Sequence, residues 1–238
     1  MHIAFLDTNT DDSEFGRSHP PECAKFQFLL RRHAPDWRYT DFRASAGNFP
    51  DSLEPFDGIM ISGSVASVND PSPWVTTLMD LIRTAVDRNI PVFGACFGHQ
   101  AIARALGGSV GNNPQGWVLG RYETHNHTPA PWMDHAGPMA LIAAHKEQVL
   151  VPPSGARIHA GTDAVPLGHM SVGTRVFSTQ YHPELSTDFM NGLLKEMEGS
   201  APQEALEAAR GGLDGPVHSD QMARWIVAFF KQARGRDA

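Results

Sequence analysis

Short apolar runs alternate with amphipathic segments along the first hundred residues. The runs that indicate buried strands cover residues 2–6, 37–42, 57–61 and 90–93. Between them, residues 23–33 carry apolar positions at helical spacing, and a second helix is expected from Ser72 and Pro73, which suit a helix cap and a first turn. Residues 8–21 are polar and indicate a loop. Strands alternating with helices predict a doubly wound, mostly parallel sheet flanked by helices.

The second half of the chain has a different pattern. After Gly108, short strand candidates follow one another without helices between them, over residues 117–124, 138–143, 157–160 and 175–180. Residues 185–197 and an apolar stripe near the C-terminus each predict a helix, whereas 199–219 indicates mostly loop with a short helix over 203–210. We therefore expect one α/β domain over 1–238, with a flavodoxin-like sheet and a β-rich second half.

Composition narrows the class of protein. Hydrophobic residues make up 41% and charged residues 19%, which suits a globular domain with a sizeable core. A net charge of -7 and a pI near 5.9 exclude the basic face that non-specific nucleic-acid binding needs. No apolar run is long enough for a membrane span, and the N-terminus has no secretion signal. With only Cys23 and Cys96, no disulfide framework is expected, and a cytoplasmic location is the simplest assumption.

Residues 91–100, Pro-Val-Phe-Gly-Ala-Cys-Phe-Gly-His-Gln, form the most informative stretch. An apolar strand meets G-x-C-x-G and an alanine-rich helical run follows, which is the cysteine form of a nucleophile elbow. Gly94 and Gly98 permit a sharp turn, and the start of the helix favours the thiolate of Cys96. A buried structural cysteine is the alternative. The paired glycines favour the nucleophile, while Cys23, on its predicted helix, is expected to pack.

A second stretch supplies partners for this cysteine. The strand at 176–180 runs into Tyr181-His182-Pro183-Glu184. Residues two apart in an extended segment point to the same side, and the proline keeps His182 extended. His182 is expected to take the proton from Cys96, and Glu184 to orient the ring and stabilise its charged form. These three residues are the predicted catalytic triad.

The two motifs together, G-A-C-F-G-H-Q and Q-Y-H-P-E, resemble those of class I glutamine amidotransferases. The resemblance covers nearly the whole chain and includes residues 61–64, 69–74 and 144–149. Within the superfamily the chain is most similar to stand-alone members related to the glutaminase domain of GMP synthase. The resemblance implies that Cys96 attacks the side-chain amide of glutamine, that ammonia leaves, and that water releases glutamate.

The resemblance also implies further site residues. The backbone N–H groups of Phe97 and of Ser64 or Gly63 would form the oxyanion hole. Gln100 matches the position that contacts glutamine, and His145 matches a recurring position for which packing and substrate contact are both open. The chain has Gly63-Ser64-Val65 where the family usually has Gly-Gly-Pro. Backbone donors do not require glycine, so the hole can form; whether the loop is already in its active conformation stays open.

Other histidines suggest weaker alternatives. His125 and His127, with His135 nearby, raise the alternative of a metal site. A polar loop near the site mouth is the plainer interpretation, because no cysteine or carboxylate cluster has metal-ligand spacing. His99 is expected to be structural. No G-x-G-x-x-G or P-loop motif occurs, and no cofactor or metal is expected.

Three functions follow from these residues. The first is a glutaminase that passes ammonia to a synthetase-type protein partner, since 238 residues leave no room for an acceptor domain. The second is a γ-glutamyl peptide hydrolase with the same triad. The third is a catalytically silent regulatory or binding protein on this fold. The complete set of Cys, His and Glu argues against the third, and the first two differ only in the leaving group.

Overall fold

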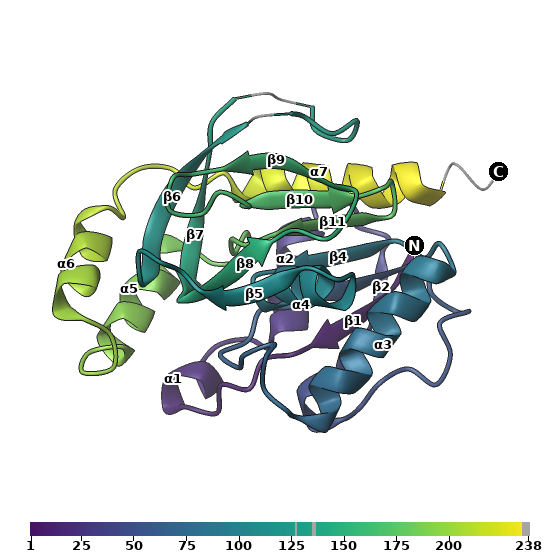
Figure 1. Ribbon diagram of the computed structural model, residues 1–238, viewed down its shortest axis with the longest axis horizontal. Helices are drawn as coiled ribbons and strands as arrows, with labels where there is room; N and C mark the ends of the chain where they lie inside the picture. Colours follow the sequence, from purple (N-terminus) through teal and green to yellow (C-terminus); the bar gives the residue numbers. More distant parts are fainter. Residues whose placement is uncertain (127, 135–136, 235–238) are drawn as a thin grey trace.

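The computed structural model describes residues 1–126, 128–134 and 137–234 (Figure 1). Within these residues a nine-stranded sheet has the order β2-β1-β3-β4-β11-β10-β9-β6-β7, and β5 and β8 form a separate pair. The strands are β1 (His2–Asp7), β2 (Arg38–Arg43), β3 (Gly58–Ile61), β4 (Val92–Ala95), β5 (Ser109–Asn112), β6 (Val118–Asn126), β7 (Met139–His145), β8 (Glu147–Val151), β9 (Ala156–Gly161), β10 (His169–Val172) and β11 (Val176–Thr179). The helices are α1 (Glu14–Arg17), α2 (Glu22–Leu30), α3 (Pro73–Asp87), α4 (Phe97–Ala105), α5 (Thr187–Glu196), α6 (Gln203–Gly211) and α7 (Ser219–Arg234), with a 3₁₀ turn at Ala44–Ala46.

The sheet is parallel in its first half and antiparallel in its second. β1 pairs in parallel with β2 and β3, and β4 pairs in parallel with β3 and β11. From β11 onward the pairings through β10, β9, β6 and β7 are antiparallel. The predicted doubly wound, mostly parallel sheet with a β-rich second half is therefore confirmed. Because the parallel strands share one direction, the loops after them meet at one edge of the sheet.

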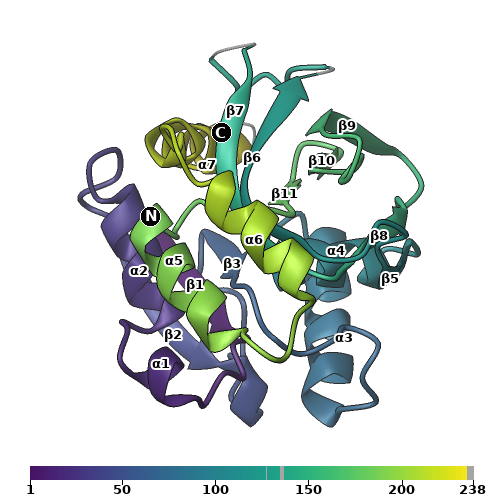
Figure 2. The ribbon, with the colours of Figure 1, turned by 90° about the vertical axis from the view of Figure 1, so that its left-hand side faces the viewer.

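The strands carry apolar side chains on both faces of the sheet, which explains why helices cover both faces. In β1, Ile3 and Phe5 join a core with α2 and α7, while Ala4 and Leu6 join a second core with α3 and α4. Successive side chains of a strand point to opposite faces, so each strand that is apolar throughout needs cover on both sides. Figure 2 shows α2 and α7 on one side of the sheet and α3 and α4 on the other.

A third core attaches α5 and α6 to β6 and β7, with Leu119, Ile142, Met190, Leu194 and Leu206 buried in it. α5 also carries the N-terminal loop: the ring of Phe15 lies 5.1 Å from that of Phe189. A Cβ on Gly192 would lie 2.6 Å from the Phe15 ring, so glycine permits this approach. The loop before α2 is thereby held against α5.

Most predicted elements are present, with several corrections. Residues 8–21 are not loop throughout, because α1 lies there, with the Ser13 hydroxyl accepting from the Gly16 N–H at 3.0 Å. β5, β8 and β10 were missed because strands of four or five residues leave little periodicity to detect. Ser72 stands at the helix cap, but its side chain makes no capping hydrogen bond. None of the helices described is long and apolar enough to cross a membrane.

Candidate active site

The elbow has the sharp geometry that its glycines predict. Cys96 joins β4 to α4 with φ of 48° and ψ of -103°, a conformation that costs energy for a residue with a Cβ. A Cβ on Gly94 would lie 2.6 Å from the backbone of Gly98, and one on Gly98 would lie 2.6 Å from the carbonyl oxygen of Ile61. Both glycines therefore permit backbone packing that no other residue could. The N–H of Cys96 donates to the carbonyl of Thr179 at 2.8 Å.

His182 and Glu184 lie at the same edge as Cys96, because β11 runs parallel to β4 beside it. Nδ1 of His182 lies 2.7 Å from Oε1 of Glu184, and the two side chains are only 11% and 1% exposed. The N–H of His182 donates to the carbonyl of Ile142 at 2.8 Å, which anchors the segment to β7. The Cys96 thiol lies close enough to the imidazole to act on its pKa. Because Glu184 occupies Nδ1, the nitrogen available to the thiol is Nε2.

The electrostatics of the imidazole follow from these two neighbours. Burial by itself lowers the pKa of His182, but the negative charges of Cys96 and Glu184 and their hydrogen bonds outweigh it. The pKa of His182 is consequently raised well above its ordinary value. The imidazolium form of His182 is the state that this arrangement stabilises.

The loop after β3 lies against the imidazole and is held by hydroxyl groups. A Cβ on Gly63 would lie 2.8 Å from Cε1 of His182. The carbonyl oxygen of Gly63 accepts from the hydroxyls of Thr8 at 3.2 Å and Ser62 at 3.0 Å. In a trans peptide the N–H points opposite to the carbonyl, so the N–H of Ser64 is directed away from Thr8.

The backbone donors expected for an oxyanion hole are available in this conformation. The N–H groups of Phe97 and Ser64 have no acceptor within the part of the chain that the structure describes. Ser64 itself is tied into the loop, since its hydroxyl accepts from the N–H of Ala66 at 3.1 Å. The conformation of the Gly63–Ser64 peptide thus depends on Thr8 and Ser62, which are both fully buried. No sequence motif pointed to these two hydroxyls.

Gln180 contacts the sulfur of Cys96, and Gln100 lies beside Gln180. The amide nitrogen of Gln180 donates to Sγ of Cys96 at 3.6 Å. The amide nitrogen of Gln100 donates to the carbonyl of Glu147 at 2.8 Å and lies 3.3 Å from the amide oxygen of Gln180. The sequence analysis named Gln100 as a substrate contact and missed the contact of Gln180, although Gln180 lies only two residues before His182.

Two further buried histidines, His145 and His99, lie near this site. His145 ends β7 and lies 5% exposed, with Nδ1 3.0 Å from the carbonyl of Glu147. Burial, and then the charge of His182, lowers the pKa of His145 to about 3. His99 is fully buried in the first turn of α4, with Nδ1 2.8 Å from the hydroxyl of Ser178. Both rings are neutral near pH 7, and the contact of His99 agrees with the structural role expected for it.

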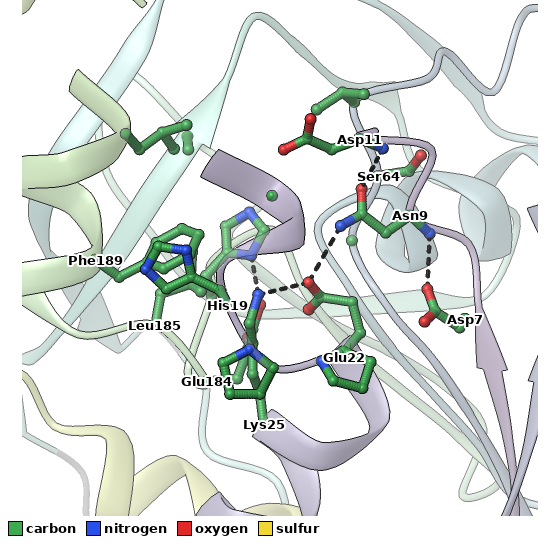
Figure 3. Close-up of a pocket in the computed structure, with 18 of the residues that line it drawn as sticks. Asp7, Asn9, Asp11, His19, Glu22, Lys25, Ser64, Glu184, Leu185 and Phe189 are labelled. Atoms are coloured by element: carbon green, nitrogen blue, oxygen red, sulfur yellow. Dashed lines mark hydrogen bonds and ion pairs between the residues drawn. The ribbon is translucent and has the colours of Figure 1, made fainter. Parts of the chain in front are cut away.

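A cavity of about 280 Å³ opens beside the imidazole (Figure 3). On the triad side it is lined by His182, Glu184, Gly63 and Ser64. Its other walls come from the loops after β1 and β2 and from α1, α2 and α5, and they include Asp7, Asn9, Asp11, Arg17, His19, Glu22, Lys25, Arg43, Leu185, Phe189 and Leu193. Sequence reasoning named none of these outer residues as site residues, because they are scattered through segments that carry no motif.

The remaining candidates lie outside this centre. Cys23 is buried in α2, where burial raises its pKa to about 11 and Gln27 donates to its sulfur at 3.2 Å. His125 lies in β6, while His127 and His135 fall outside the described residues. No group of three or more His, Cys, Asp or Glu side chains in the described ranges is arranged to hold a metal ion.

Comparison with known proteins places this geometry in a family. Residues 37–194 match the family of class I glutamine amidotransferases. Gamma-glutamyl peptidase 4 of Arabidopsis thaliana is 31% identical over 190 residues, which cover 76% of this chain and 75% of that protein. The GMP synthase of Aeropyrum pernix is 31% identical over 138 residues, covering 54% of this chain and 24% of that protein. The structure of a glutamine amidotransferase from Thermotoga maritima superposes with a TM-score of 0.73 at 15% identity, covering 98% of this chain and 97% of that one.

A cysteine elbow at the carboxyl edge of a flavodoxin-like sheet defines an α/β protein of the amidotransferase and hydrolase class. The chain belongs to the class I glutamine amidotransferase family. It is similar to part of a GMP synthase and to a γ-glutamyl peptidase.

Proposed function

We propose that the chain hydrolyses a γ-glutamyl amide through a thioester on Cys96, with His182 and Glu184 as the other members of the triad. The observation that carries this proposal is the strained Cys96 at a strand end, close to an imidazole that Glu184 holds at 2.7 Å. A structural cysteine needs neither the positive φ nor the buried acid–imidazole pair. The side-chain amide of glutamine is the smallest substrate of this class.

In the proposed reaction, Sγ of Cys96 bonds to the γ-carbonyl carbon and the carbonyl oxygen becomes an oxyanion. The N–H groups of Phe97 and of Ser64 (or Gly63) stabilise that oxyanion. His182 transfers a proton to the amide nitrogen, the carbon–nitrogen bond breaks, and the amine leaves. Water, deprotonated by the same imidazole, then attacks the thioester, which releases glutamate and restores the thiol. Gln100 and His145 are proposed to contact the glutamyl part. Gln100 lies in the helix that follows Cys96, His145 ends β7, and both side chains contact the carbonyl of Glu147.

The test is glutamate release from glutamine and from γ-glutamyl peptides, combined with intact-mass detection of the acylated protein. Cys96→Ala is expected to abolish release and acylation, whereas Cys23→Ala, the matched control, leaves both in place. If Cys23→Ala abolishes release and Cys96→Ala does not, the assignment of the nucleophile is wrong.

With glutamine as the substrate, the ammonia is proposed to pass to a synthetase-type partner. The relatives include a GMP synthase, of which the matched part is only 24%. If ammonia passes to a partner, the isolated chain should release glutamate slowly, and addition of the partner should make the release faster. Turnover of glutamine near the common enzyme rate of about 10 per second, without any partner, would contradict it.

A γ-glutamyl peptide is the second candidate substrate. Its support is the relative from Arabidopsis thaliana described as a γ-glutamyl peptidase, which aligns over three quarters of both chains. The thioester is the same for both substrates, so the choice depends on the amine that leaves.

A further inference from the structure

The cavity beside His182 is much larger than the departure of ammonia requires. Its volume is about 280 Å³. A cavity of about 10–15 Å³ is enough to hold a molecule the size of water. The cavity also begins at the imidazole, which is the group that must deliver a proton to the leaving nitrogen. The leaving amine and whatever is attached to it therefore face this space.

The position of the cavity separates it from the glutamyl part of the substrate. Its walls include His182, Glu184 and Gly63, whereas neither Gln100 nor Phe97 is among the described residues that line it. The side chain proposed to contact the glutamyl group thus lies outside this cavity. On this ground we assign the cavity to the leaving side of the amide bond.

Two guanidinium groups line the cavity. Arg17 and Arg43 are exposed, and neither forms a close ion pair with a residue that the structure describes. Arg17 donates to the carbonyl of Asp12. The positive charge of Arg43 acts on the carboxyl groups of Asp7 and Asp41. Lys25 differs, because it is paired with the buried carboxylate of Glu22 at 2.7 Å. A planar guanidinium binds a carboxylate through two parallel hydrogen bonds, which an ammonium cannot do.

The acidic groups near these arginines are occupied by backbone donors. Asp7 accepts from the N–H of Asn9 at 3.0 Å, and Asp11 accepts from the N–H of Ser13 at 3.0 Å. A guanidinium has five N–H donors, so both arginines keep donors available to an anion.

One wall of the cavity is apolar and ordered. Leu185, Phe189 and Leu193 line it, and the ring of Phe189 lies under the ammonium of Lys25 at 4.6 Å. Figure 3 shows Leu185 and Phe189 on the side of the cavity away from Asp7 and Asn9. The cavity thus offers an apolar surface and an anion-binding surface on either side of one space. An amino acid with an apolar side chain and a free carboxylate has both features.

We propose that this cavity is the leaving-group subsite for a γ-glutamyl peptide whose departing amino acid has an apolar side chain and a free α-carboxylate. The apolar side chain lies against Leu185 and Phe189, and the carboxylate lies between Arg17 and Arg43. As the thioester forms on Cys96, the carbon–nitrogen bond breaks and the departing amino group takes its proton from His182. The assignment rests on the proposed γ-glutamyl hydrolase activity and names its substrate class.

The experiment compares kcat/KM for glutamine, γ-glutamyl-leucine and γ-glutamyl-leucinamide, which lacks the carboxylate. The wild-type protein is expected to prefer γ-glutamyl-leucine to glutamine by at least about tenfold. Replacing the carboxylate by an amide in γ-glutamyl-leucinamide is expected to lower that preference by about tenfold, which is the effect of one charge-assisted hydrogen bond. Arg17→Gln and Arg43→Gln are each expected to have the same effect. Because the substrate change and the arginine change remove one interaction, their effects together should not add.

Arg88→Gln serves as the matched control, because Arg88 is an exposed arginine in an ion pair with Glu54 at 3.7 Å and lies outside the cavity. In Arg88→Gln, the ratio of kcat/KM for γ-glutamyl-leucine to kcat/KM for glutamine should equal that of the wild type. Calorimetric binding of γ-glutamyl-leucine to Cys96→Ala gives a second measurement that needs no turnover, and Arg43→Gln in that background should weaken it.

The outcomes separate the two proposals. Glutamate release from glutamine at a kcat/KM equal to or above that for γ-glutamyl-leucine overturns the subsite and leaves the hydrolase proposal intact. A preference for γ-glutamyl-leucine that neither arginine variant changes also overturns the subsite. Failure of the folded wild type to hydrolyse any of the three compounds overturns the proposed function itself.

Discussion

Replacing Gly63 by alanine tests whether the loop after β3 and the imidazole are in their working positions. Gly63 does not have a positive φ, so alanine causes no backbone strain there. The added Cβ would lie 2.8 Å from Cε1 of His182 and 3.6 Å from Cβ of Cys96, whereas ordinary contact begins at 3.4 Å. The change therefore acts on the imidazole alone.

The imidazole has little freedom to avoid this contact. Relief requires a shift of about 0.6 Å, but the ring is held through the 2.7 Å bond from Nδ1 to Glu184. The loop is equally restricted, because the carbonyl of Gly63 accepts from Thr8 and Ser62. Misplacement of a reacting group by about 1 Å costs about a hundredfold in rate, so a fall in kcat of about ten- to hundredfold is expected.

The assay is glutamate release from a γ-glutamyl substrate, with kcat and KM determined separately and thermal unfolding recorded for each variant. Gly211→Ala is the matched control, since a Cβ there has no heavy atom within 4 Å and Gly211 has no positive φ. It should leave kcat unchanged. A Gly63→Ala protein that folds and keeps the wild-type kcat would refute the assignment of His182 as the base in this conformation.

Three further predictions concern the same centre. His182→Asn should lower kcat by several orders of magnitude, whereas Glu184→Gln should cost less and shift the pH–rate profile to lower pH, because the negative charge that raises the pKa of His182 is lost; a larger loss for Glu184→Gln would contradict these roles. Thr8→Val should reduce kcat by about tenfold with little change in KM, and Thr8→Ser should restore it, because the hydroxyl orients the peptide of the loop after β3; equal rates for the two variants would count against this. Finally, three buried histidines have pKa values lowered to about 3 by burial: His99, His145 and His169. The unfolded chain binds protons below about pH 6.5 that the folded chain does not, so stability is retained above that pH and lost as the pH falls, by up to about 4 kcal/mol per pH unit. Urea unfolding at pH 7 and pH 5 measures this loss, and equal stability at both values would refute it.

The sequence by itself determined the features that depend on neighbours along the chain. Continuous apolar runs such as that of β1 require cover on both faces, which predicts the doubly wound sheet. The glycines around Cys96 permit its sharp turn, and the proline after His182 keeps the histidine extended. These are local constraints, and they were sufficient to predict the elbow and its partner motif. The same reasoning missed α1 and β10, because four residues show too little of any period.

Only the tertiary structure decided how the loops at the carboxyl edge meet. Thr8 and Ser62, 54 positions apart, form the hydroxyl pair that holds Gly63, and Gln180 reaches a sulfur 84 positions away. Arg17 and Arg43 line one cavity because α1 is held against α5 and β2 ends beside β1. The order of strands in a sheet sets which loops are neighbours, and hydrophobic alternation does not specify that order. For this reason the cysteine elbow could be predicted from residues 91–100, while the shape of the cavity beside His182 could not.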